Sequence, residues 1–357
     1  MIGIDKTTIN GIGVVNINFD KLMTNDNVIW SREGTIINIP TNVPNEYKEV
    51  SYLKITDEQM FNTLCLGVKV CGGKLITYCL LELHIRSACG DNSNPLNIEA
   101  YKHMLKQIRK YIIQRYGVTL DFSDIGFKEL EINCTFKLDT DFKEYEYLLR
   151  RMNELAPKRY KDRAIYTDNE DNIKEVVFFN KSANLKIYDK KKQLEEVYKI
   201  KINDNLMRIE YTFNRSQKVE DTFGTNKVNA LTDEAIRGYI VQAIEKDLIN
   251  PVYKHIEEAN KQLVKKAKEY KKLYPRGWGV RFISDARHFK MTRKKKDSSE
   301  LIEENKLLLI DNQQLKEIIY SEMKNKQSVK RLYKEIECIK PSCATIEKLE
   351  YIHNNIK

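Results

Sequence analysis

The chain has 357 residues and a mass of 42.0 kDa, more than one compact core usually holds, so we expect two or three structural units. Hydrophobic residues at 41% and charged residues at 31% exclude wholesale disorder and a collagen-like sequence. The 61 Lys and Arg exceed the 51 Asp and Glu by 10, and the resulting pI near 9.0 favours a polyanionic partner, with nucleic acid first.

No segment predicts export or membrane insertion. The opening MIGIDKTTINGIG lacks the apolar core of a signal peptide, and no window approaches the roughly 18 apolar residues of a membrane span. The seven cysteines are odd in number and scattered, which is typical of reduced thiols. We therefore expect a cytoplasmic protein with no disulfides and no membrane partner.

Short strands alternate with helices from about residue 11 to about residue 213. Two amphipathic helices are predicted at 97–116, ended by Gly117, and at 141–154, ended near Pro157. They are expected to cover one face of an antiparallel sheet, so the predicted fold class is α+β, followed by an α-helical C-terminal region. The strand candidates are GVVNINF, VKV before a glycine pair, LITYCLLELHIR, FKELEINCTFKL, VVFFN, LKIYDK and LMRIEYTF.

Helical patterns replace the strand signal in the rest of the chain. A long helix is predicted from Thr232 to about Lys272, with a pause at Asn250-Pro251. Residues 254–296 contain 15 Lys or Arg and 4 Asp or Glu, an excess that accounts for the whole net charge. We predict three domains, at 1–215, 216–296 and 300–357.

Four of the strands carry polar side chains at alternate positions. Because successive side chains of a strand point to opposite faces, neighbouring strands of one sheet would gather these groups on one side. The gathered residues are Glu82, His84, Glu131, Asn133, Lys186, Tyr188, Lys190, Arg208 and Glu210. An ordinary solvated sheet face alternates in the same way and is the alternative interpretation.

This combination of groups suits metal-assisted cleavage of a phosphodiester. Carboxylates and imidazole bind Mg²⁺ or Mn²⁺, and the ion polarises phosphoryl oxygens. The predicted ligands are Glu82, His84, Glu131 and Glu210. Tyr188 would attack phosphorus and form a phosphotyrosine. The predicted cations beside the phosphate are Lys186, Lys190 and Arg208.

At these residues the chain resembles the rolling-circle replication initiators of the filamentous-phage gene II protein family and the related plasmid Rep proteins. The resemblance runs in order along about residues 1 to 290. It is carried by MIGIDKTTI, CLLELHIRSACGDN, FKELEINCTFKLDTDFKEYEYLL, VVFFNKSANLKIYDKKKQL and LMRIEYTF.

The resemblance implies a specific reaction and roles for named residues. Such initiators nick one strand of a double-stranded origin, stay attached to the 5′ phosphate, and leave a 3′ hydroxyl for a host polymerase working with a helicase. Tyr188 matches the nucleophile of the family, which makes residues 1–215 the catalytic domain. Arg208 and Glu210 match a recurrent acidic strand, and Glu82 matches the acidic residue before the first long helix.

Two departures from the family pattern keep other hypotheses open. Where the family usually has R-I-D, this chain has Glu131-Ile132-Asn133, so either Glu131 replaces the missing charge or metal binding is weak. His84 has no histidine two positions away, which counts against a conjugative relaxase. The alternative function is therefore a non-catalytic, sequence-specific DNA-binding protein on the same fold.

The basic segment predicts contacts with origin DNA and with the nicked single strand. Tyr270, Tyr274 and Trp278 lie among its cations, which suits base stacking as well as phosphate binding, and a solvated basic helix is the alternative. The helix pair around Pro341 fits either a helix-turn-helix or a simple packing unit. Plasmid or phage origin and homodimer formation are left open. The predicted DNA-binding residues are Lys186, Arg276, Arg281, Arg287, Arg293, Lys294, Lys295 and Lys296.

Overall fold

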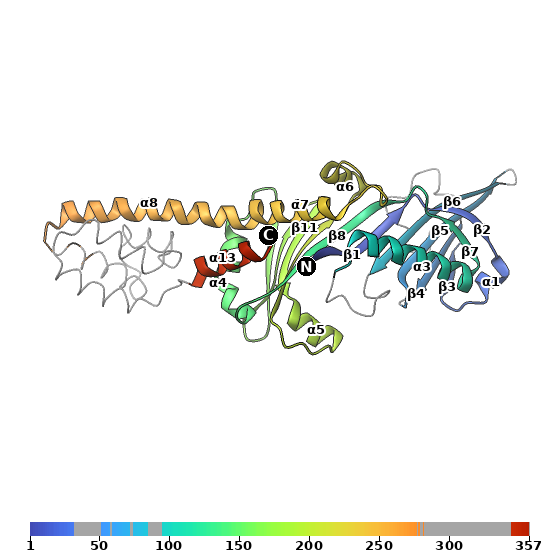
Figure 1. The fold of residues 1–357 in the computed structure, drawn as a ribbon, viewed down its shortest axis with the longest axis horizontal. Coiled ribbons are helices and arrows are strands. Elements are labelled where there is room, and N and C mark those ends of the chain that lie inside the picture. The colour runs from blue at the N-terminus through green and yellow to red at the C-terminus, as the bar shows by residue number, and fades with distance from the viewer. Residues whose placement is uncertain are drawn as a thin grey trace. The chain divides into compact units, whose positions relative to one another are not determined.

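The alternating segments form a ten-stranded antiparallel sheet in the computed structural model (Figure 1). The structure describes residues 1–31, 51–57, 59–71, 74–84, 95–276, 278, 281 and 344–356. In spatial order the strands are β3 (Val28–Ser31), β4 (Ser51–Asp57), β5 (Phe61–Cys71), β6 (Lys74–His84), β1 (Ile2–Asn10), β8 (Gly126–Lys137), β12 (Leu206–Phe213), β11 (Ala183–Asp189), β10 (Ile173–Phe179) and β9 (Asp162–Thr167). A second sheet pairs β2 (Gly13–Ile17) with β7 (Val118–Asp121).

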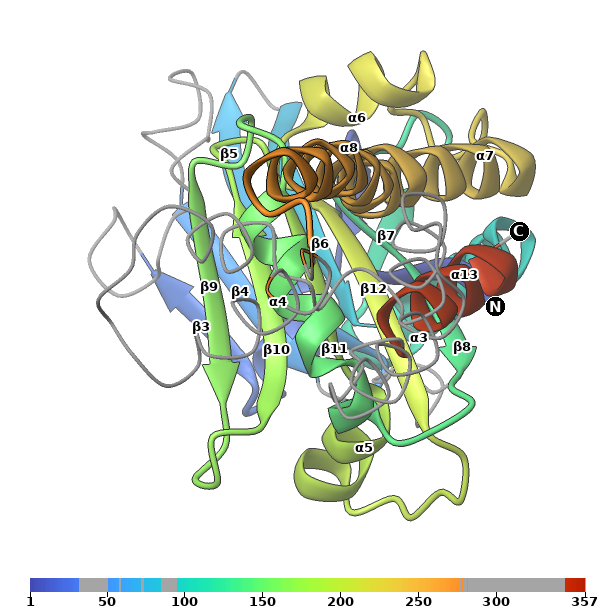
Figure 2. The same cartoon turned by 90° about the vertical axis from the view of Figure 1, so that its left-hand side faces the viewer.

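The described chain divides into two compact units. The first contains Met1–Asp139 and Arg159–Gln242, and the second contains Thr140–Lys158 and Ala243–Lys357. The large sheet belongs to the first unit, where β9, β10, β11 and β12 lie side by side (Figure 2). The domain boundaries expected after residues 215 and 296 stay predictions.

Helix α3 (Ile98–Tyr116) covers the apolar face of the sheet (Figure 1). It begins after Asn97, whose side chain accepts a hydrogen bond from the Ala100 N–H, and it ends at Gly117 in the left-handed conformation. The Tyr101 hydroxyl lies 2.7 Å from Thr7 Oγ1 on β1. The helix predicted at 97–116 is thus confirmed. Its buried stripe is Ile98, Tyr101, Met104, Leu105, Ile108, Ile112 and Tyr116.

Two further helices lie on the same face, α6 (Ser216–Phe223) and α7 (Asp233–Ile244). Tyr239 of α7 packs its ring against Tyr211 and Phe213 of β12, with centroids 5.8 and 5.4 Å apart. Phe223 of α6 contacts the same Phe213 at 5.5 Å. Two short helices, α1 (Phe19–Met23) and α5 (Lys190–Tyr198), complete the unit as described. The predicted α+β class is confirmed.

The described part of the second unit is helical. It contains α4 (Glu146–Leu155), α8 (Asn250–Leu273) and α13 (Ala344–Ile356). The pause predicted at Asn250-Pro251 is wrong, because both residues belong to the first turn of α8, which directly follows a π-helical turn at Glu245–Ile249. The Lys348 ammonium of α13 donates to Thr140 Oγ1 at 2.7 Å and lies over the Tyr145 ring. Within the described ranges, the helices are all too short or too polar to cross a membrane.

Gly3 provides a test of the packing around β1. A Cβ at Gly3 would lie 2.3 Å from the carbonyl oxygen of Leu96, where Leu96 and Ile4 exchange two backbone hydrogen bonds. We expect Gly3→Ala to lower the free energy of unfolding by about 1–3 kcal/mol, measured by urea denaturation. Gly238→Ala on α7, where nothing lies within 4 Å, should raise it by about 0.5–1 kcal/mol. Equal stability of the two variants would contradict the close approach at Gly3.

Candidate active site

Three carboxylates meet on the polar face of the sheet. Asp5 on β1, Glu131 on β8 and Glu210 on β12 each place one oxygen within 4.8 Å of the other two. These strands are direct neighbours, and Glu210 pairs with Asn133 while Thr212 pairs with Glu131. The sheet register therefore brings together acids that are far apart in the sequence. We call these three residues the acid cluster.

A β-bulge in β1 aims Asp5 into the acid cluster. The pairing of β1 with β8 shifts by one residue between Ile4 and Thr7. Ile4 is fully buried and Thr7 contacts Tyr101 of α3, so both belong to the helix-covered face. The two residues between them, Asp5 and Lys6, both reach polar partners on the opposite face.

Tyr188 and Arg208 flank the acid cluster on β11 and β12. The Tyr188 hydroxyl donates a 2.5 Å hydrogen bond to Glu210 Oε1, so it faces the acids rather than the apolar interior. Arg208 is fully buried, and its guanidinium donates to Asp5 Oδ2 at 2.8 Å and to Thr135 Oγ1 at 2.7 Å. The register that pairs Tyr188 with Arg208 creates this arrangement.

Burial and neighbouring charges raise the pKa values of Glu131, Glu210 and Tyr188. Burial is the largest cause for Glu210, followed by the charges of Glu131 and Asp5, and together they raise its pKa to about 8. The pKa of Glu131 is raised by burial and by Asp5. The pKa of the Tyr188 phenol is raised strongly, by burial first and then by Glu210. A cation held between the carboxylates would offset their repulsion.

The donor set fits a hard divalent cation. Carboxylate and amide oxygens are the ligands that Mg²⁺ and Mn²⁺ prefer. Asn133 is fully buried beside the acid cluster, and within the described residues its Nδ2 has no hydrogen-bond partner. The Asn133 Oδ1 accepts a 3.3 Å bond from Thr135 Oγ1. Asn133, which stands where the resembling family usually has Asp, is therefore an amide with one unsatisfied nitrogen. The third carboxylate of the site comes from Asp5 instead.

The other predicted ligands, Glu82 and His84, lie one strand away on β6. Glu82 Oε1 is 3.1 Å from the Lys6 ammonium and 3.4 Å from His84 Nε2. These contacts, that with His84 first, lower the pKa of Glu82 to about 2. The structure thus unites Glu131 and Glu210 with Asp5, which the sequence analysis missed, and places Glu82 and His84 in a separate pair. The alternation of Gly3 and Asp5 in MIGIDKTTI was the signal for the missing acid.

A cleft of about 260 Å³ opens beside Tyr188 and Glu210. Lys190 and Arg208, predicted to contact the phosphate, are fully buried and do not line it. The Lys190 ammonium instead donates to Gln193 at 2.8 Å. The lining cations are Lys174, Lys186 and Lys192, with ion-pair partners Glu196 at 3.0 Å, Glu175 at 3.9 Å and Asp168 at 2.6 Å respectively.

Few of the predicted DNA-binding residues of the basic segment belong to the described chain. Arg276 and Arg281 are exposed, and the Arg281 guanidinium lies 4.3 Å from the centroid of the Tyr274 ring. Tyr270 and Trp278 are only 7% and 5% exposed, so their rings are packed rather than free to stack on bases. The residues outside the described ranges are Arg287, Arg293, Lys294, Lys295 and Lys296.

The sequence and the structure were compared with known proteins. No family model matches the sequence, and no curated protein matches it. Among solved structures, the chain is similar to a rolling circle replication initiator protein from Geobacillus stearothermophilus. The identity is 8%, the match covers 69% of this chain and 84% of that chain, and the TM-score is 0.34. The candidate site therefore depends on its own geometry.

The raised pKa values make stability depend on pH. Glu131 and Glu210 ionise near their ordinary pKa in the unfolded chain, whereas the fold keeps them protonated to higher pH. Their contribution to stability is present at low pH and is lost as the pH rises toward the Glu210 pKa of about 8. Between about pH 5 and about pH 8, we expect the wild type to lose on the order of 3 kcal/mol relative to Glu210→Gln.

Urea denaturation at both pH values, with a chelator present, measures this difference. Glu99→Gln is the matched control, because Glu99 is exposed on α3 and should leave the wild-type pH profile unchanged. If the free energy of unfolding depended on pH in the same way in the wild type and in Glu210→Gln, the fold would not raise the pKa of Glu210.

Proposed function

We propose that the chain is a replication initiator that nicks one strand of a double-stranded origin through Tyr188. One observation carries the proposal: the Tyr188 hydroxyl is hydrogen-bonded to Glu210, which belongs to a cluster of three carboxylates, at the wall of a cleft. Nucleophile, base and candidate metal ligands thus lie on neighbouring strands. The sequence resemblance points to the same tyrosine.

The proposed step is a transesterification. Tyr188 Oη forms a bond to phosphorus while the bond from phosphorus to the 3′ oxygen breaks. The phenolic proton passes to Glu210 Oε1, which already accepts the hydrogen bond of the Tyr188 hydroxyl. The 3′ oxygen takes a proton from water and becomes the primer end for a host polymerase. The phosphotyrosine keeps the energy of the broken bond for later strand closure.

Asp5, Glu131 and Glu210 would hold Mg²⁺ or Mn²⁺, with Asn133 beside them. The ion supplies Lewis-acid polarisation of the phosphoryl oxygens when it is bound. Arg208 positions Asp5 by a buried ion pair, so it acts on the acids and not on the phosphate. Lys186 and Lys192 line the cleft and would contact the DNA backbone in exchange for their present ion pairs.

A non-catalytic DNA-binding protein on the same fold is the second candidate. One observation favours it, because Tyr188 is only 7% exposed and is held by Glu210. The basic segment fits both candidates, since both bind DNA.

Tyr188→Phe separates the two functions. Supercoiled DNA of the replicon that encodes the chain, incubated with protein and Mn²⁺, should be relaxed by the wild type with a covalent DNA adduct. The variant should form neither product at a detectable level, because the attacking oxygen is gone, yet it should still bind the DNA. Tyr166→Phe is the control, since Tyr166 is an exposed tyrosine of β9. An adduct with Tyr188→Phe would assign the nucleophile elsewhere, and no relaxation by the wild type would favour the non-catalytic candidate.

Metal binding is tested by thermal unfolding with and without Mn²⁺. Saturation at about 100 times Kd stabilises a protein by about 2.7 kcal/mol, so the wild-type Tm should rise. The double variant Asp5→Asn, Glu131→Gln should lose this response, because it removes two of the three charges. The double variant Glu82→Gln, His84→Gln should keep it, since these residues lie outside the acid cluster. The reverse pattern would return the ligand role to Glu82 and His84.

A further inference from the structure

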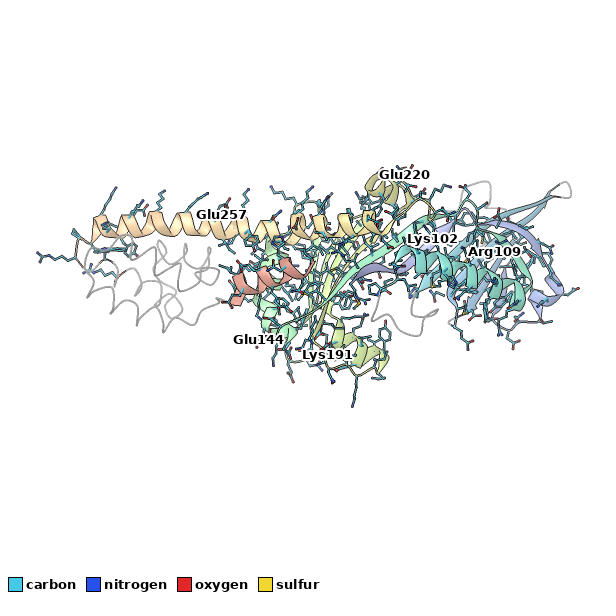
Figure 3. All side chains as sticks on the ribbon, viewed as in Figure 1. Lys102, Arg109, Glu144, Lys191, Glu220 and Glu257 are labelled. Atoms are coloured by element: carbon cyan, nitrogen blue, oxygen red, sulfur yellow. The ribbon has the colours of Figure 1, made fainter. Side chains whose placement is uncertain are left out.

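The solvent side of α3 is strongly basic. The sequence analysis assigned the whole charge excess to residues 254–296, but α3 also holds many more cations than acids. Its acidic residue is Glu99, which pairs with Lys102 at 2.8 Å. Figure 3 labels Lys102 and Arg109 on this helix. The lysines and arginines of α3 are Lys102, Lys106, Arg109, Lys110 and Arg115.

The middle of this surface is not neutralised within the protein. Lys106, Arg109 and Lys110 are exposed, and no carboxylate in the described part of the chain lies within ion-pair distance of them. By contrast, Arg115 lies 3.8 Å from Asp57. On the exposed side of a helix, positive and negative residues usually alternate. Three cations without an ion pair within about one turn therefore create a local positive field.

A groove of about 310 Å³ runs beside these cations. Lys102, Lys106 and Arg109 form one wall. Its other lining residues include apolar groups such as Phe122 and Ile125. Asp121 also lines the groove and is occupied by Ser123, whose N–H and hydroxyl donate to it at 3.0 and 2.8 Å. The charge of Arg109 also lowers the pKa of Asp121, but the two groups form no ion pair in the described chain, so the three cations can still bind an external anion.

The basic surface is separate from the candidate active site. Helix α3 packs on the sheet through Tyr101, which contacts Thr7 and Phe127 on the apolar face. Asp5 and the other members of the acid cluster point to the opposite face, as the alternation and the bulge in β1 require. A strand held in the cleft at Tyr188 would not reach α3 through the sheet.

We infer that the surface formed by Lys106, Arg109 and Lys110 binds the phosphate backbone of duplex DNA. A helix rises about 1.5 Å per residue, so the stripe from Lys106 to Lys110 covers about 6 Å. Phosphates of one strand are about 3.4 Å apart along the duplex axis, so the stripe spans about two to three of them. Contacts to phosphates do not distinguish one base pair from another, so we expect this binding to be independent of the DNA sequence.

This inference rests on the proposed function only for the identity of the polyanion as origin DNA. The surface would hold duplex next to the nicking site while the cleft on the other face receives the strand to be cut. A variant can therefore lose DNA binding at α3 and keep cleavage at Tyr188, or the reverse.

The test compares two charge-matched triple variants of the full chain. Lys106→Gln, Arg109→Gln, Lys110→Gln removes the stripe, and Lys161→Gln, Arg163→Gln, Lys181→Gln removes two lysines and one arginine that are exposed elsewhere in the same unit. The probe is a fluorescent duplex of about 20 base pairs with arbitrary sequence, titrated at several salt concentrations. Each lost phosphate contact lowers the slope of log affinity against log salt by about 0.9, so the stripe variant should lose about 2 to 3.

The control variant should keep the wild-type slope, and circular dichroism should confirm that both variants are folded. An unchanged slope in the stripe variant, or an equal loss in both variants, would overturn the inference. A loss seen only with a single-stranded probe would overturn the assignment to duplex. Adduct formation at Tyr188 is measured in parallel, so failure of the nicking proposal is distinguished from failure of this one.

Discussion

The buried guanidinium of Arg208 is the interaction on which the polar face depends. Three carboxylates within 4.8 Å repel one another, and water that would screen them is excluded by burial. Arg208 lies fully buried and bonds Asp5 and Thr135, so it supplies the fixed positive charge inside the sheet. Breaking such a buried pair generally costs about 3–5 kcal/mol. Tyr188 and Glu210 keep their mutual hydrogen bond in the field that this cation creates.

The two faces of the sheet in the first unit carry different kinds of groups. The polar face carries the acids, the phenol and the cleft, whereas the apolar face carries α3, α6 and α7. The proposed nicking site and the proposed duplex surface therefore belong to opposite sides of one rigid layer. Such separation keeps the exposed cations of α3 away from the acid cluster, so the two proposed sites do not neutralise each other.

Strand alternation and helix stop signals predicted much of this architecture. The segments LKIYDK and LMRIEYTF alternate clearly, and their side chains lie on the expected faces, with Leu185 and Ile187 fully buried. The strands β3, β4, β7 and β9 were missed. For β9 the reason is its place at the edge of the sheet. It has no buried residue, so its sequence lacks the alternation of apolar and polar residues that predicts a strand.

The candidate site was predicted less completely, because the sequence alone reveals neither which strands pair nor which polar side chains are buried. Asp5 was missed because the local alternation in MIGIDKTTI marks a polar position but not its neighbours, and the pairing of β1 between β6 and β8 is a long-range property. The burial of Lys190 and Arg208 could not be foreseen, since a polar residue at an alternate position is usually solvated. Tyr188 was predicted as the nucleophile because resemblance and alternation agreed on it, and this role stays a prediction.

The bulge in β1 has a consequence for how such a sheet can change. By inserting one extra residue it sends an acid toward β8 and β12 and an ammonium group toward β6 from adjacent positions. A single deletion at the bulge would withdraw one of these two groups from its neighbours. The proposed metal site therefore depends on the length of β1 at this point as well as on the identity of its side chains.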